Sequence, residues 1–145
     1  MTSSAAITVD LIEGAVDSIA PDPTPPHGGG GHCAFAGYTR AEKHPVHGDL
    51  ICLDYDCYRD MARDELKQLA AEAASRFGAV AVSIIHAVGR VDVGQASVRI
   101  DVVCPHRDEA FLACRFLIDT LKSRVPIWKR EVWSDGSTWR DGVPI

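Results

Sequence analysis

Two lysines lie seven positions apart in the segment Asp119 to Glu131, which reads D-T-L-K-S-R-V-P-I-W-K-R-E. Lys122 lies on the polar side of an apolar helical stripe, and Pro126 is expected to end that helix before Lys129. Such a turn lets both amines reach one pocket. Neighbouring cations and partial burial lower the pKa of a lysine towards the range useful for proton transfer or nucleophilic attack. The segment therefore predicts a site for an anionic substrate; the alternative is a solvated basic helix end that complements the macrodipole.

A second cationic group, His106 and Arg107, lies where a strand gives way to the same helix. Backbone N–H groups at a helix start, an imidazole and a guanidinium all favour an anion. We predict an anion-binding role for this pair. The alternative is an ordinary helix start in which Arg107 pairs with a carboxylate such as Glu109.

Two further polar residues have weaker signals. Glu131 is expected to hold Lys129 or Arg130 in place, or else to form a plain ion pair at a strand edge. His86 lies at the end of a strand, where a histidine is more often a hydrogen-bonded structural residue than a ligand. We therefore interpret His86 as structural.

Composition indicates an ordinary globular chain of 145 residues, with 46% hydrophobic and 24% charged residues. This length predicts one domain, residues 1–145, which buries roughly two thirds of its unfolded surface. The net charge is −5, yet residues 99–130 hold seven Lys or Arg against four Asp or Glu. Such a local basic region suits a small anion or an acidic tail and disfavours nucleic-acid binding. With no membrane-length apolar run and no basic, apolar leader, we expect a cytoplasmic protein.

The five cysteines form an odd number without a C-x-x-C motif. This argues against both a zinc site and a disulfide framework, so buried free thiols are expected. His44 and His47 form only an H-x-x-H pair, which is too weak a signal for a metal site. We predict neither a metal nor a cofactor.

Hydrophobic periodicity predicts two amphipathic helices. One covers Arg59 to Phe77 and ends near Gly78. The other is marked by an i, i+3, i+4, i+7 stripe formed by Ala110, Phe111, Cys114, Leu117, Ile118, Leu121 and Val125. A short helix is also possible over Gly14 to Ala20.

Strands are predicted over residues 7–11, 32–38, 49–57, 80–85, 97–104, 127–133 and 138–140. A turn over Gly89 to Gly94 joins two of them, and Ser134-Asp135-Gly136 closes the last hairpin. The Pro- and Gly-rich run over residues 21–31 is expected to be a mobile loop. Because strands cluster rather than alternate strictly with helices, the sequence predicts an α+β fold.

Four blocks of sequence together resemble one known family. The lysine segment closely resembles the signature D-x-L-K-x-x-x-P-x-W-K-x-E of the molybdopterin synthase catalytic (large) subunit. Residues 35–40, F-A-G-Y-T-R, are similar to its F-x-G-x-x-R, and residues 53–61, L-D-Y-D-C-Y-R-D-M, to its L-x-Y-x-x-Y-x-x-M. His106-Arg107 followed by Ala110-Phe111 matches H-R-x-x-A-F. One departure is His86-Ala87-Val88-Gly89, where the family usually has H-R-x-G.

The resemblance implies an α/β-hammerhead-type fold and specific site residues. Lys122 matches the lysine held essential in the family, and Lys129 matches a second lysine that orients or neutralises substrate. Arg40, His106 and Arg107 match positions expected to bind phosphate or pterin. The remaining expected substrate contacts are Phe35, which is equally consistent with core packing, together with Arg130 and Glu131.

The resemblance also implies a sulfur-transfer reaction. The expected substrate is cyclic pyranopterin monophosphate, which becomes molybdopterin in molybdenum cofactor biosynthesis. Sulfur is expected from the C-terminal Gly-Gly thiocarboxylate of a small ubiquitin-like carrier, within a heterotetramer built on a homodimer of this chain. The alternative is a non-catalytic homologue that binds such a carrier or a small anion.

Overall fold

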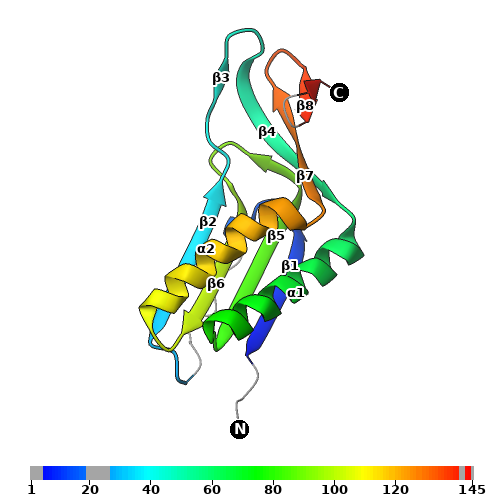
Figure 1. Cartoon of the computed structure of the whole chain (residues 1–145). Coiled ribbons are helices and arrows are strands. Elements are labelled where there is room, and N and C mark those ends of the chain that lie inside the picture. Colours follow the sequence, from blue (N-terminus) through cyan, green and yellow to red (C-terminus); the bar gives the residue numbers. More distant parts are fainter. Residues whose placement is uncertain (1–4, 19–26, 141–142, 145) are drawn as a thin grey trace.

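The computed structural model describes residues 5–18, 27–140 and 143–144. Two helices lie side by side on one face of a twisted sheet, and a β-ribbon projects beyond them (Figure 1). The helices are α1 (Arg59–Phe77) and α2 (Arg107–Arg124). Neither is long and apolar enough to cross a membrane.

The described residues form nine strands and one short 3-10 helix. The strands are β1 Ala6–Glu13, β2 Gly31–Tyr38, β3 Lys43–His44, β4 Gly48–Cys57, β5 Ala81–Asp92, β6 Ala96–Cys104, β7 Ile127–Trp133, β8 Thr138–Arg140 and β9 Val143–Pro144. The main order is β2-β6-β5-β4-β7-β8-β9, with β1 parallel to β5 and β3 antiparallel to β4. The α+β class predicted from the sequence is confirmed.

The core lies between the two helices and the strands beneath them. Helix α1 contributes a fully buried stripe formed by Ala62, Leu66, Leu69, Ala70 and Ala73. Helix α2 contributes Ala110, Ala113, Cys114, Leu117 and Leu121. These spacings place one face of each helix on the sheet, which explains why periodicity located the helices so well. Gly78 ends α1 with a φ of 67°, a left-handed conformation that favours glycine.

Strand β5 differs most from the prediction. It runs on to Asp92, so Gly89 lies inside the strand and the turn is confined to residues 93–95. The first part of β5 pairs with β6 as far as His86, and the last part pairs with β4 from Gly89 onwards. Gly89 has a φ of +82°, and the strand changes partner next to it. The predicted turn over Gly89 to Gly94 was wrong because its first glycine serves a change of partner within a strand.

Two other predictions concern the segment after β1. A 3-10 helix covers Val16–Ser18, within the short helix expected over Gly14 to Ala20. Residues 21–26 of the expected mobile loop lie outside the described residues, whereas Gly31 already begins β2. A Cβ on Gly31 would lie 2.8 Å from the Cα of Arg107, so the missing side chain lets β2 begin against the start of α2.

Candidate active site

Lys122 and Lys129 come from two different elements joined by a short turn. Lys122 is in the last turn of α2, and Val125 leaves the helix with a ψ of 132° before Pro126. Strand β7 begins at Ile127, so Lys129 follows two residues later. The proline thus redirects the chain as the sequence predicted.

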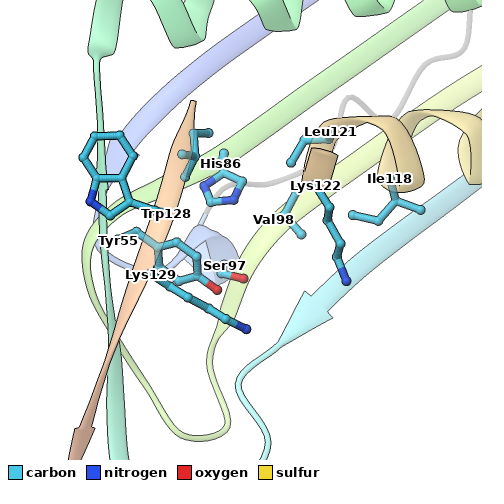
Figure 2. A pocket seen from close by; sticks show the side chains of 10 residues that line it. Tyr55, His86, Ser97, Val98, Ile118, Leu121, Lys122, Trp128 and Lys129 are labelled. Carbon is cyan, nitrogen blue, oxygen red and sulfur yellow. The ribbon is translucent and has the colours of Figure 1, made fainter. Parts of the chain in front are cut away.

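Both lysines line one pocket of about 370 Å³ between the end of α2 and the strands below it (Figure 2). The other lining residues are Tyr55, His86, Ser97, Val98, Ile118, Leu121, Ile127 and Trp128. Its volume is within the range of small-molecule sites. The walls combine apolar and polar side chains, and two ammonium groups at the exposed edge form a setting suited to an anionic ligand.

The neighbouring arginines turn away from this pocket. Arg124 pairs with Glu65 at 2.9 Å and also with Glu72, both on α1. Arg130 pairs with Asp54 at 2.6 Å on β4. Within the described residues neither pocket lysine forms an ion pair, whereas both arginines do. The carboxylates of α1 and β4 thus bind both arginines, and neither arginine lines the pocket.

The floor of the pocket carries three polar side chains from three strands. Tyr55 of β4 hydrogen-bonds Ser97 of β6, and its ring meets that of His86 of β5 edge-on, with centroids 5.1 Å apart. Burial raises the pKa of Tyr55, and the hydrogen bond to Ser97 opposes that shift. Burial also lowers the pKa of His86, whose Nδ1 lies 2.7 Å from the Ala87 carbonyl oxygen. At neutral pH the floor is therefore uncharged.

Comparison with known proteins gives the family. The family model described as MoaE protein matches residues 6–124. The chain belongs to the MoaE protein family. A molybdopterin synthase catalytic subunit from Nostoc sp. is 51% identical over 92 residues, which cover 62% of this chain and 56% of that protein. One from Pyrococcus abyssi is 38% identical over 119 residues, covering 80% of this chain and 79% of that protein. The MoaE family therefore supplies the catalytic subunit of molybdopterin synthase, which acts in molybdenum cofactor biosynthesis.

Solved structures share the fold of this MoaE chain. The crystal structure of molybdopterin synthase from Staphylococcus aureus matches with a TM-score of 0.78 and 30% identity, covering 90% of this chain and 96% of that chain. A complex of subunits 1 and 2 of molybdopterin-converting factor from Helicobacter pylori matches with a TM-score of 0.70 and 22% identity, covering 91% of this chain and 87% of that chain. The family resemblance seen in the four sequence blocks is confirmed.

Two of the predicted substrate contacts of this MoaE chain lie along β2 and just beyond it. The Phe35 ring lies beside Gly37, because a Cβ on Gly37 would be 3.5 Å from Phe35 Cε1 and 2.9 Å from Val98 Cγ1. Phe35 thus flanks Val98, which is a wall of the pocket. Arg40 does not line the pocket; its side chain is 85% exposed and lies 3.7 Å from Glu42.

His106 and Arg107 lie at the opposite end of α2 from Lys122. The fifteen-residue separation between Arg107 and Lys122 corresponds to about 22 Å along a helix. Both residues are exposed, and His106 caps the helix start without a side-chain hydrogen bond. Within one chain, the structure therefore does not bring this pair to the lysine pocket, and its role with substrate stays a prediction.

Arg130 and Glu131 lie on β7 beside Lys129 but do not line the pocket. Arg130 is bound to Asp54 rather than to Glu131, and Glu131 pairs in register with Leu53. The sequence missed Tyr55, His86 and Ser97 as pocket residues. Tyr55 had a signal, since it belongs to the resembling block over residues 53–61. His86 also had one, as the histidine at the position of the family's H-R-x-G, but was interpreted as structural; Ser97 had none.

None of the five cysteines of this MoaE chain lines the pocket. All five are free, and Cys52, Cys104 and Cys114 are buried. Burial raises the pKa of Cys114 to about 12, and its neighbour Cys33 adds to that rise. A thiol with so high a pKa is a poor nucleophile. The part of the chain that the structure describes holds no cluster of three or more His, Cys, Asp or Glu suited to a metal.

Proposed function

We propose that this chain transfers sulfur from the C-terminal thiocarboxylate of a small carrier protein to cyclic pyranopterin monophosphate, with Lys122 and Lys129 as the catalytic groups. The product is molybdopterin, with its dithiolene sulfurs. The cytoplasmic location expected from the sequence belongs to the same proposal.

The convergence of Lys122 and Lys129 on one pocket is the observation that carries the proposal. A thiocarboxylate is already a nucleophile, so the catalytic chain has to position two anionic partners, neutralise their charge and move protons. Two ammonium groups that no carboxylate of the described residues binds are suited to these tasks.

An external sulfur source fits the position of the thiols. None of the five cysteines lines the pocket, so within this chain no thiol lies where the substrate would react. The Helicobacter pylori relative is described as a protein–protein complex of two subunits. By analogy we propose that this chain binds a ubiquitin-like carrier with a Gly-Gly tail, whose lack of side chains suits a narrow pocket. The proposed assembly is a heterotetramer built on a homodimer.

The substrate roles of the other predicted residues are part of the proposal. Phe35 flanks the pocket wall and suits a contact with the pterin. Arg40, His106 and Arg107 are exposed cations outside the pocket of their own chain and suit anion binding. Single substitutions of these residues can measure how much each contributes to substrate affinity.

The non-catalytic alternative drew on the replacement of the family arginine by Ala87. Ala87 is fully buried, in a small cluster with Val16, Val91 and Ala96. Neither Ala87 nor these neighbours line the lysine pocket. Tyr55 packs against the same cluster, so the replacement touches the pocket only through packing and leaves both lysines in place.

The decisive experiment is Lys122→Ala with thiocarboxylated carrier and cyclic pyranopterin monophosphate. Loss of proton-transfer help typically lowers a rate by ~10²–10⁴. We expect a fall of this size in product formation, with folding and carrier binding kept, because Lys122 is exposed and outside the core. Lys67→Ala, an exposed lysine on α1, is the matched control. Turnover within about twofold of the parent in Lys122→Ala would remove Lys122 from the mechanism and favour the non-catalytic alternative.

A further inference from the structure

The buried histidine of the pocket has a defined tautomer. His86 is only 5% exposed, and its Nδ1 lies 2.7 Å from the Ala87 carbonyl oxygen. A carbonyl only accepts hydrogen bonds, so Nδ1 carries the proton and Nε2 has the lone pair. The bond to Ala87 thus leaves Nε2 as the acceptor atom of the ring. Since His86 lines the pocket, Nε2 is an acceptor reserved for whatever enters it.

Tyr55 supplies a second acceptor beside the first. Its hydroxyl hydrogen-bonds Ser97, and Ser97 Oγ lies 3.5 Å from the Gly37 carbonyl oxygen. A hydroxyl oxygen has two lone pairs, so the Tyr55 oxygen keeps at least one that can accept, whichever of the two hydroxyls donates to the other. Tyr55 and His86 are also held edge to face on two paired strands, which fixes their relative position.

The hydrogen-bonding groups on the floor of the pocket thus differ from those at its edge. The lining residues with polar or charged side chains are Tyr55 from β4, His86 from β5, Ser97 from β6, Lys122 from α2, and Trp128 and Lys129 from β7. Of these only the lysines are charged, and both are exposed, whereas His86 and Ser97 are buried. Lysine ammonium groups can only donate. The floor therefore offers acceptors at His86 Nε2 and the Tyr55 oxygen, whereas the lysines at the edge only donate.

We propose that Tyr55 and His86 form an acceptor subsite that binds the N–H edge of a flat heterocycle whose anionic group is bound by Lys122 and Lys129. Val98 and Leu121 supply apolar walls against which a ring can pack. The inference rests on the proposed function, since a pterin carries ring N–H and amino donors on its pyrimidine edge and a phosphate elsewhere. It assigns ring recognition to two residues and charge recognition to two others.

Substitutions can separate these two kinds of recognition. Tyr55→Phe keeps the ring and removes the hydroxyl acceptor. His86→Asn keeps a donor near Nδ1 and removes the acceptor at Nε2, whereas His86→Gln can place an amide oxygen near Nε2. Tyr58→Phe is the matched control, because Tyr58 is 65% exposed and lies outside the pocket.

The measurement is calorimetric binding of cyclic pyranopterin monophosphate and, as a separate probe, of inorganic phosphate. We expect Tyr55→Phe and His86→Asn each to weaken pterin binding about tenfold, the usual effect of one lost hydrogen bond. Phosphate affinity should stay within about twofold of the parent, and His86→Gln should bind the pterin more tightly than His86→Asn. Thermal unfolding checks that each variant is folded; should His86→Asn not fold, Tyr55→Phe carries the test.

Several results would overturn the inference. Parental pterin affinity in Tyr55→Phe and His86→Asn would show that the floor does not contact the ring. An equal loss of phosphate and pterin affinity would show that these residues act only through the shape or charge of the whole pocket. His86→Gln as weak as His86→Asn would remove the acceptor role of His86. A parent protein that binds phosphate but not the pterin would instead refute the proposed function, and the subsite with it.

Discussion

Lys122 and Lys129 reach the same pocket because helix α2 ends between them. Pro126 stops α2 one turn after Lys122, and β7 then returns the chain past the same cavity. The flanking arginines are bound by carboxylates of α1 and β4, which leaves the two lysines as the cations of the pocket within the described residues. A cation at the exposed edge of an apolar pocket attracts an anion strongly at low ionic strength and more weakly as salt screens it.

Lys129→Ala tests this charge directly. Hydrogen bonds to charged groups contribute about 1.5–3 kcal/mol, so we expect KM for cyclic pyranopterin monophosphate to rise roughly 10–100-fold at low salt. The difference from the parent should shrink as salt is raised, because screening weakens the parental attraction. Steady-state kinetics at several ionic strengths is the measurement, with Lys43→Ala, an exposed lysine on β3, as the control. An unchanged KM at low salt would place the anion elsewhere.

At the scale of elements, the β-ribbon beyond the helices is closed by contacts between its two hairpins. His47 Nδ1 lies 2.8 Å from Asp135 Oδ2, and the backbone N–H of Asp49 donates to Ser134 Oγ at 2.8 Å. The His47 and Trp139 rings also pack, with centroids 4.7 Å apart. The ribbon contains β4 and β7, the strands that carry Tyr55 and Lys129. These contacts therefore help to keep two pocket residues in register.

Asp135→Asn should change the pH dependence of stability. Hydrogen bonds from the side chain and backbone of Ser137, followed by the one from His47, lower the pKa of Asp135 to about 2. An unfolded aspartate has a pKa of about 3.9. The folded pKa is the lower one, so the stabilisation is present above about pH 4 and is lost as pH falls from about 4 towards 2.

The measurement is urea unfolding of the parent and the variant between pH 2 and pH 6. We expect the parent to be more stable above pH 4 and the two curves to converge near pH 2. Asp64→Asn, an exposed carboxylate on α1, should leave the parental pH dependence nearly unchanged. A constant difference between parent and Asp135→Asn over the whole range would show that ionisation of Asp135 does not couple to folding.

For the whole molecule, the position of the pocket agrees with the proposed external sulfur source. The fold buries Cys52, Cys104 and Cys114, and the pocket opens where α2, β4, β5, β6 and β7 meet, without a cysteine among its lining residues. This chain contributes positioned positive charge to the pocket. Under the proposed function, sulfur enters with a carrier that reaches the lysines from outside.

Single replacement of each cysteine tests this conclusion. We expect every folded variant of Cys33, Cys52, Cys57, Cys104 and Cys114 to form product when given thiocarboxylated carrier. Alanine is preferable at the buried positions, because a buried serine hydroxyl would need a new partner. The carboxylate form of the carrier should bind without turnover. Loss of turnover in one well-folded single variant would show that sulfur passes through a thiol of this chain.

The sequence alone determined the local features of this protein. Helix α1 was predicted at its observed bounds, and so was the closing hairpin of β7 and β8, because apolar periodicity and turn residues act over a few positions. The turn between Lys122 and Lys129 was also predicted, because Pro126 restricts the backbone of the residue before it. The four motif blocks were enough to identify the family, since each is a short contiguous stretch of sequence.

Only the tertiary structure decided which distant residues share the pocket. Tyr55, His86 and Ser97 meet through the pairing of three strands, and no local pattern marks such a meeting. The partners of Arg124 and Arg130, and the place at which β5 changes its neighbour, likewise depend on segments more than thirty positions apart. Chemistry carried by contiguous residues could be read from the sequence. Chemistry created by strand register and helix packing could not, because those contacts exist only once the chain has folded.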